Sequence, residues 1–252
     1  MLLIANWKMA PDKPVQASDL AKKSLAIAKA HKALSIIACV PYIHLTSVIK
    51  VARAPLAIGA QSVASTIDVA QTGLVNALML KGYGVTHCIV GHSESRKRGD
   101  TNEEIGEQSV RLLEKQIIPI LCIGEKSRDA HGWHLSEVKE QIEAVLNVVQ
   151  QSQLKKIIIA YEPVWAIGKD ALREATPKEC NEMIIFIRKV IADHAGEKIA
   201  TSLPIIYGGS VNELNARYFV ADGGVGGFLV GRVSLEPKRF AALADAIDVK
   251  KK

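Results

Sequence analysis

The sequence lacks the features that mark secreted, membrane-spanning and metal-dependent proteins. Its 252 residues include only four cysteines, Cys39, Cys88, Cys122 and Cys180, with no C-x-x-C pair and no histidine at ligand spacing. This spacing predicts neither a disulfide framework nor a zinc site. No apolar run approaches the roughly 18 residues of a membrane span, and no basic leader with a cleavage site precedes the first strand-like segment. We therefore expect a soluble, cytoplasmic protein that holds no metal.

Neither charge nor size requires a second domain or a nucleic-acid partner. The formal net charge is +6, but the Lys and Arg residues are scattered along the predicted helices, and the only terminal cluster is 250–252. We expect no nucleic acid and no membrane as partner, whereas a modest positive field would steer a small phosphorylated ligand to the protein. The length suits one α/β barrel, and no linker interrupts the composition, so we expect a single domain over residues 1–252.

Short apolar, β-branched segments recur along the chain and predict strands. They are continuous in hydrophobicity, as expected of parallel strands that are covered on both faces. Segments with helical period lie between them, and capping boxes at 101–104 and 176–179 mark two helix starts. The helices after the second, third and seventh strands are expected to be shorter. The predicted strands are 2–7, 35–41, 56–61, 86–92, 117–125, 156–163, 204–210 and 227–232.

The alternation of strand and helix predicts a parallel sheet, either open and doubly wound or closed. The turn after the first strand, Asn6-Trp7-Lys8-Met9-Ala10, has none of the glycines that admit a dinucleotide pyrophosphate. Eight repeated units favour closure. We therefore predict an α/β fold, a single-domain (β/α)8 TIM barrel with eight parallel strands.

Active sites of such barrels lie at the carboxyl ends of the strands, so the polar residues that end each run are candidates. Glu162 ends the sixth run, where burial should raise its proton affinity as a general base needs; a structural carboxylate that caps a loop or pairs with arginine is the alternative. His92 ends the fourth run, before a helix start that disfavours imidazolium. A neutral ring there would donate a hydrogen bond, although histidines often have only structural roles.

Two further strand ends suggest a site for an anion. Lys8 and Asn6 close the first run, and Lys8 either attracts an anionic ligand or is merely solvated. The glycine-rich turns around Ser210 and Gly231 expose backbone N–H groups after the seventh and eighth strands, the usual phosphate site of this fold. Alternatively, these glycines serve only tight turns. A serine nucleophile elbow is excluded at 91–95, because Ser95 stands where glycine is required.

Eight stretches distributed over nearly the whole chain resemble the triosephosphate isomerases. The resemblance implies interconversion of dihydroxyacetone phosphate and D-glyceraldehyde 3-phosphate through an enediolate, in glycolysis and gluconeogenesis, with neither metal nor organic cofactor. The longest of the eight stretches is the one most specific to this family. The matching stretches are 6–9, 59–61, 72–73, 91–94, 122–125, 160–168, 207–211 and 228–231.

The resemblance also implies roles for individual residues. Glu162 would move the proton, neutral His92 with Asn6 and Lys8 would stabilise the enediolate oxygen, and Glu94 would be a supporting acid. The segment 163–176 is similar to the family's lid, which closes over the substrate. Its first part is Pro163, Val164, Trp165, Ala166, Ile167 and Gly168. The phosphate-binding set implied by the resemblance is Asn6, Lys8, Gly168, Ser210, Gly231 and Arg232.

The chain departs from the family pattern at three places. Arg232 replaces a glycine, so its side chain either crowds the turn, leaves only its amide in use, or binds the phosphate through the guanidinium. The hinge 169–174 is about two residues longer, which predicts slower or looser closure. The loop with Thr72 and Gly73 is expected to contact a partner in a homodimer. Three positions of that contact lack the polar residues that the family often has there, which predicts a more apolar contact. They are Ala10, Leu74 and Ser95.

Two other functions fit part of the pattern. One is a different barrel enzyme that acts on a sugar phosphate, which the fold and the phosphate turns alone would permit; the Glu162 segment argues against it. The other is a barrel that has lost catalysis and serves as a scaffold, suggested by Arg232 and the altered hinge. The retention of Asn6, Lys8, His92 and Glu162 argues against the scaffold.

Overall fold

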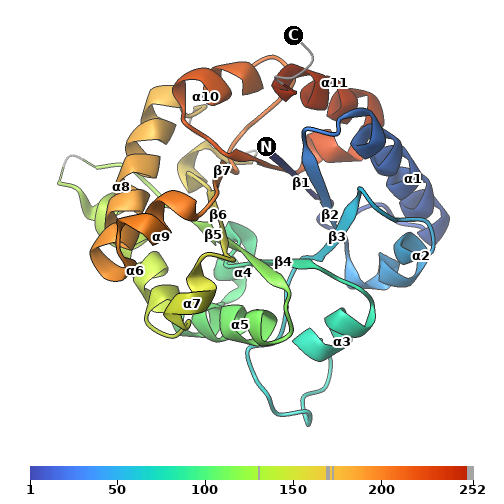
Figure 1. The fold of residues 1–252 in the computed structure, drawn as a ribbon, viewed down its shortest axis with the longest axis horizontal. Coiled ribbons are helices and arrows are strands. Elements are labelled where there is room, and N and C mark those ends of the chain that lie inside the picture. Colours follow the sequence, from blue (N-terminus) through green and yellow to red (C-terminus); the bar gives the residue numbers. More distant parts are fainter. Residues whose placement is uncertain (130, 169–170, 172, 249–252) are drawn as a thin grey trace.

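Eight parallel strands form a closed barrel in chain order, with helices packed around it (Figure 1). The computed structural model describes residues 1–129, 131–168, 171 and 173–248. The hinge positions Lys169, Asp170 and Leu172 and the basic tail 250–252 lie outside the described residues. The strands are β1 Leu2–Asn6, β2 Ser35–Cys39, β3 Ala57–Ala60, β4 His87–Val90, β5 Ile118–Ile123, β6 Ile158–Tyr161, β7 Ile205–Tyr207 and β8 Gly227–Val230.

Closure follows from the pairing of β1 with both β2 and β8. Leu2 is in register with Ser35 of β2 on one side and with Gly227 of β8 on the other. The predicted barrel is confirmed and the open sheet is wrong. The strands end one to three residues earlier than the apolar runs, because the last residues of several runs turn out of the sheet toward the mouth of the barrel. Glu162, for example, directly follows the last residue of β6.

The helices occupy the connections as the periodicity predicted. Those after β2, β3 and β7 are short, at five, six and seven residues. Both capping boxes are present: Thr101 with Glu104 at the start of α5, and Thr176 with Glu179 at the start of α8. The helices are α1 Pro14–Ala30, α2 Leu45–Ile49, α3 Ala77–Gly82, α4 Ser93–Arg98, α5 Asn102–Glu114, α6 Trp133–Leu146, α7 Gln151–Leu154, α8 Pro177–Ala195, α9 Glu197–Ser202, α10 Ala216–Asp222 and α11 Pro237–Ile247. Three 3₁₀ turns are η1 Tyr42–His44, η2 Val164–Ala166 and η3 Arg232–Leu235.

Buried apolar side chains form two layers. The larger lies between strands and helices. The smaller is an inner column that fills the barrel itself, so the barrel is packed rather than hollow and ligands are confined to its two ends. The column consists of Ile4, Ile37, Cys39, Ile89, Ile120, Cys122, Ile158, Ala160, Ile206 and Leu229. None of the helices within the described part of the chain has the length and hydropathy to cross a membrane.

Candidate active site

The carboxylate of Glu162 lies at the centre of the barrel mouth. Only 2% of Glu162 is exposed, and its backbone N–H donates to the carbonyl of Ile123 on β5 (2.8 Å). The backbone N–H of Ser93 donates to Oε2 (3.3 Å), and Nε2 of His92 lies 3.5 Å from Oε1. A carboxylate with few hydrogen bonds and little water is suited to take a proton from a ligand.

Two glycines make room for Glu162. A Cβ on Gly124 would lie 1.8 Å from the carbonyl oxygen of Glu162, and a Cβ on Gly208 would lie 2.8 Å from its Cγ. Any side chain at either position would therefore displace Glu162. These glycines follow β5 and β7, the strands on either side of β6, so the placement of the carboxylate depends on the whole local sheet.

The orientation of His92 assigns its protons. His92 caps the amino end of α4, and its Nδ1 accepts the backbone N–H of Glu94 (3.1 Å). A nitrogen that accepts a hydrogen bond carries no proton, so the ring is neutral and its proton is on Nε2. Nε2 is the atom that faces Glu162. The ring therefore presents one N–H donor to the mouth.

Lys8 is held in the mouth by its backbone and by a salt bridge. Its φ is +52°, an uncommon value for a residue with a side chain, and its N–H donates to Oδ1 of Asn6 (3.1 Å). Its Nζ lies 2.5 Å from Oε1 of Glu94. Burial acts to raise the pKa of Glu94, but the hydrogen bond and charge of Lys8 outweigh it and lower that pKa. The Glu94 carboxylate thus stays ionised and positions Lys8.

One cavity of about 440 Å³ joins the acid–base residues to the predicted phosphate subsite. Every residue of the predicted phosphate-binding set lines it, together with His92 and Glu162. Glu94 does not: it lies behind Lys8, beside a neighbouring cavity. The predicted members that line the cavity are Asn6, Lys8, His92, Glu162, Gly168, Ser210, Gly231 and Arg232.

Arg232 begins η3 on the rim of this cavity. It is not among the described residues with a positive φ, so its Cβ occupies an ordinary backbone conformation and the predicted crowding has no backbone basis. Its side chain is exposed, and no ion pair or hydrogen bond joins the guanidinium to any residue that the structure describes. By contrast Arg239, which also lines the cavity, is paired with Glu213 and Glu236. The guanidinium of Arg232 is therefore available to bind an anion.

The buried carboxylate of Glu125 anchors the first part of the lid. Its Oε1 accepts hydrogen bonds from the Trp165 indole (2.7 Å) and the Tyr161 hydroxyl (2.9 Å), and Arg128 lies 3.3 Å away. A second hydrogen bond holds the same part of the lid: the Ser210 hydroxyl donates to the carbonyl of Ala166 (3.0 Å). Glu125 follows an apolar strand just as Glu162 does, but that position alone predicts no role for it.

Glu179 secures the far end of the lid. The hydrogen bond from Arg173 is the main cause that lowers the pKa of Glu179 to about 2, against burial, and Thr176 adds to it. The guanidinium of Arg173 also lies 4.6 Å from the ring centre of Trp165. Both ends of the lid are thereby connected through one arginine.

We expect Glu179→Gln to lower the free energy of unfolding by about 1–2 kcal/mol at pH 7, because the charge pair with Arg173 is lost, although glutamine can still accept the capping N–H of Thr176. The folded pKa lies below the ordinary value of 4.5, so the carboxylate stabilises the fold fully above about pH 5 and progressively less as the pH falls toward 2. Urea unfolding of both proteins between pH 7 and 3 should show the difference shrinking. The control is Glu104→Gln, the same capping position in α5 with no arginine partner among the described residues. A difference independent of pH would contradict the assignment.

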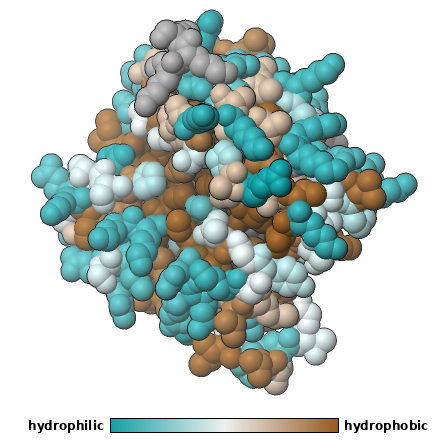
Figure 2. All heavy atoms as spheres, turned by 45° about the vertical axis from the view of Figure 1, so that its right-hand side comes forward, coloured by the Kyte–Doolittle hydropathy of each residue, from teal (hydrophilic) through white to brown (hydrophobic). Residues whose placement is uncertain are grey.

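Thr72 and Gly73 do not line this cavity. The segment between β3 and α3 projects from the barrel as a long loop (Figure 1), and apolar side chains gather at its tip (Figure 2). Val69 is 87% exposed there. A second cavity of about 600 Å³ adjoins Lys8 and includes Met9, which is 96% exposed.

A closed (β/α)8 barrel with a carboxylate, an imidazole and a lysine at its mouth is a TIM-barrel enzyme. Among the described residues, no cluster of three or more His, Cys, Asp or Glu is arranged to hold a metal ion. Residues 1–247 match the family model for triosephosphate isomerase, and the chain belongs to that family.

Curated relatives match nearly the whole length of the chain. A triosephosphate isomerase of Dictyoglomus turgidum is 34% identical over 242 residues, 95% of this chain and 96% of the relative. Those of Caldanaerobacter subterraneus subsp. tengcongensis and Clostridium botulinum are each 35% identical, and each alignment covers 97% of this chain and 98% of the relative. The resemblance predicted from the motifs is confirmed.

Proposed function

We propose that this protein interconverts dihydroxyacetone phosphate and D-glyceraldehyde 3-phosphate, the aldose–ketose isomerisation of its family, as a step of glycolysis and gluconeogenesis. The observation that carries the proposal is the shared cavity, in which Glu162 and the Nε2–H of His92 face the same space as the glycine-rich turns at Ser210 and Gly231. A coupled assay of the purified protein with glyceraldehyde 3-phosphate tests it. Absence of turnover by folded protein would favour the scaffold instead.

In the proposed reaction, Glu162 takes a proton from C1 of dihydroxyacetone phosphate and returns it to C2. The electrons of the broken C–H bond form the enediolate, whose C2 oxygen accepts the Nε2–H of His92 and faces the ammonium of Lys8. The enediolate hydroxyl proton passes between the two oxygens, so atoms and charge balance. Gly168 and the lid would exclude water, which strengthens each of these interactions.

The phosphate would bind the amides of Gly168, Ser210 and Gly231 and the guanidinium of Arg232. We expect Arg232→Gly to raise KM about five- to tenfold and leave kcat within about twofold, because a charge-assisted hydrogen bond on an exposed rim contributes to binding but does not reach the reacting carbons. Steady-state kinetics at low and high salt measure this, and the difference should shrink as salt rises. An unchanged KM would show that only the amide at position 232 is used.

We also propose that the protein is a cytoplasmic homodimer. The exposed apolar tip of the β3–α3 loop, next to Thr72 and Gly73, is suited to enter the partner's second cavity beside Lys8. Leu74 is exposed on the same loop, whereas Ser95 is buried and bonded to the carbonyl of His92.

Analytical ultracentrifugation at micromolar concentration should give about twice the 27.3 kDa mass of the chain. Val69→Asp should shift the protein toward the monomer by at least about tenfold in Kd, because a charge would be buried in an apolar contact. The exposed Val148, remote from this loop in the sequence, offers the control Val148→Asp. A monomeric wild type would contradict the proposal.

A further inference from the structure

The end of the barrel opposite the active site contains a second hollow, to which the isomerase chemistry gives no role. It has a volume of about 690 Å³ and is lined by residues at the amino ends of the strands. Leu2, Ala57 and Ile118 are partly buried, pack against the inner column and line this hollow. Its floor is therefore apolar and continues the interior of the barrel. The size is typical of sites for small organic ligands.

The rim of this hollow is cationic. Lys32, Lys155 and Lys156 line it, and all three are exposed, with no hydrogen bond or ion pair from their ammonium groups to any other described residue. Among the described residues that line it, none is Asp or Glu. Asp245 of α11 reaches this end of the barrel, but its carboxylate lies 3.0 Å from the ring of His31.

The positive charge at this end of the barrel extends to the connections that precede β2, β3, β5 and β6. The connections that lead directly into strands contain no acidic residue. Cations near helix carboxyl ends are common because they offset the helix dipole, but this does not explain an apolar hollow between three of them. The Lys and Arg residues of these connections are Lys32, Lys50, Arg53, Lys115, Lys155 and Lys156.

We propose that this hollow binds a small amphipathic anion, a free carboxylate, sulfonate or phosphate ester with an apolar body. The apolar body lies on Leu2, Ala57 and Ile118, where its burial provides the binding energy. The anionic group meets the three rim lysines. A polyanion or a bilayer would contact the outer cations and leave a concave apolar floor unfilled, so the hollow favours a small ligand.

The character of the floor fits this ligand. His87 lies at the start of β4 and lines the hollow. Burial lowers its pKa to about 4, so the ring is neutral at physiological pH. The floor thus has low polarity and no charge, and the attraction for an anion comes from the rim alone.

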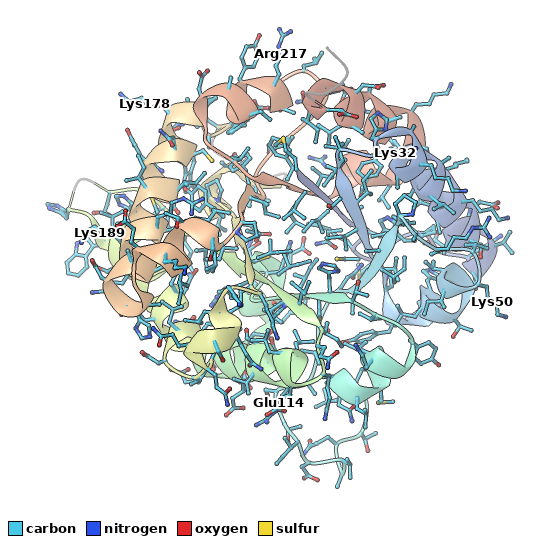
Figure 3. All side chains as sticks on the ribbon, viewed as in Figure 1. Lys32, Lys50, Glu114, Lys178, Lys189 and Arg217 are labelled. Atoms are coloured by element: carbon cyan, nitrogen blue, oxygen red, sulfur yellow. The ribbon has the colours of Figure 1, made fainter. Side chains whose placement is uncertain are left out.

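The probe is 8-anilinonaphthalene-1-sulfonate, with the uncharged N-phenyl-1-naphthylamine as its counterpart, in saturating inorganic phosphate to occupy the active site. The test protein is Lys32→Glu/Lys155→Glu/Lys156→Glu. A control of equal net charge is Lys23→Glu/Lys178→Glu/Lys189→Glu, on the outer surfaces of α1 and α8; Figure 3 labels Lys178 and Lys189 along the outer edge of the molecule. Fluorescence titration gives the Kd of each protein.

We expect saturable binding of one sulfonate per chain, weakened at least about tenfold by the rim substitutions and less than about twofold by the control. The uncharged probe should bind more weakly, and the rim substitutions should leave its Kd unchanged. Unchanged isomerase activity in the rim variant would show that it folds. Equal loss in both variants, equal binding of both probes, or no saturable binding would overturn the proposal. The proposal would also be overturned if the rim substitutions abolished cosedimentation with phosphatidylglycerol vesicles but left sulfonate binding unchanged.

Discussion

Glu162→Gln should lower kcat by about 10³- to 10⁴-fold while the fold remains intact. Glutamine has the shape of glutamate, so it preserves the clearance that Gly124 and Gly208 provide and can still accept the N–H of Ser93. It cannot take up a proton near neutral pH. Steady-state kinetics in both directions and thermal unfolding of the two proteins measure the effect.

The length of the side chain provides a graded comparison. Glu162→Asp retains the carboxylate but withdraws it by one methylene, and we expect a loss of about 10²-fold, smaller than that of the glutamine variant. If glutamine and wild type turn over within tenfold of each other, Glu162 is not the base.

His92→Gln should lower kcat by about 10²- to 10³-fold and change KM little. Nε2–H is the only donor that the ring offers to the mouth, because Nδ1 is occupied by the amide of Glu94. Loss of one donor aimed at a developing oxyanion has an effect of this size. Steady-state kinetics of the variant and the wild type measure it.

Glu94→Gln is the matched control for His92. It retains the backbone N–H that fixes the imidazole tautomer and removes only the charge that holds Lys8. We therefore expect KM to rise more than kcat falls, since Lys8 would be less well placed toward the anionic substrate. A His92→Gln variant with near wild-type kcat would show that Lys8 alone stabilises the enediolate.

Much of the fold was predictable because its signals are local. Continuous apolar runs bounded by polar residues located all eight strands, and Thr101 and Thr176 located two helix starts. The candidate site was predictable for the same reason: Asn6, His92 and Glu162 lie where apolar runs end, and the fold brings strand ends together.

The rest depends on contacts between distant segments. Nothing in the sequence around Gly124 reveals that a Cβ there would collide with Glu162. The proton on Nε2 of His92 depends on the path of α4, and the role of Glu125 depends on Trp165 reaching it from the lid. The cationic hollow is assembled from Lys32 and Lys155, more than one hundred residues apart in the chain. Periodicity carries no information about such pairs.

The central claim is that this barrel catalyses isomerisation by proton transfer through a carboxylate, and proton NMR of glyceraldehyde 3-phosphate with the enzyme in D₂O tests it most directly. We predict rapid formation of dihydroxyacetone phosphate that carries deuterium at C1, because a proton held by Glu162 exchanges with solvent before it is returned. Folded, dimeric protein that forms no product, or product that never contains deuterium at C1, would contradict the account.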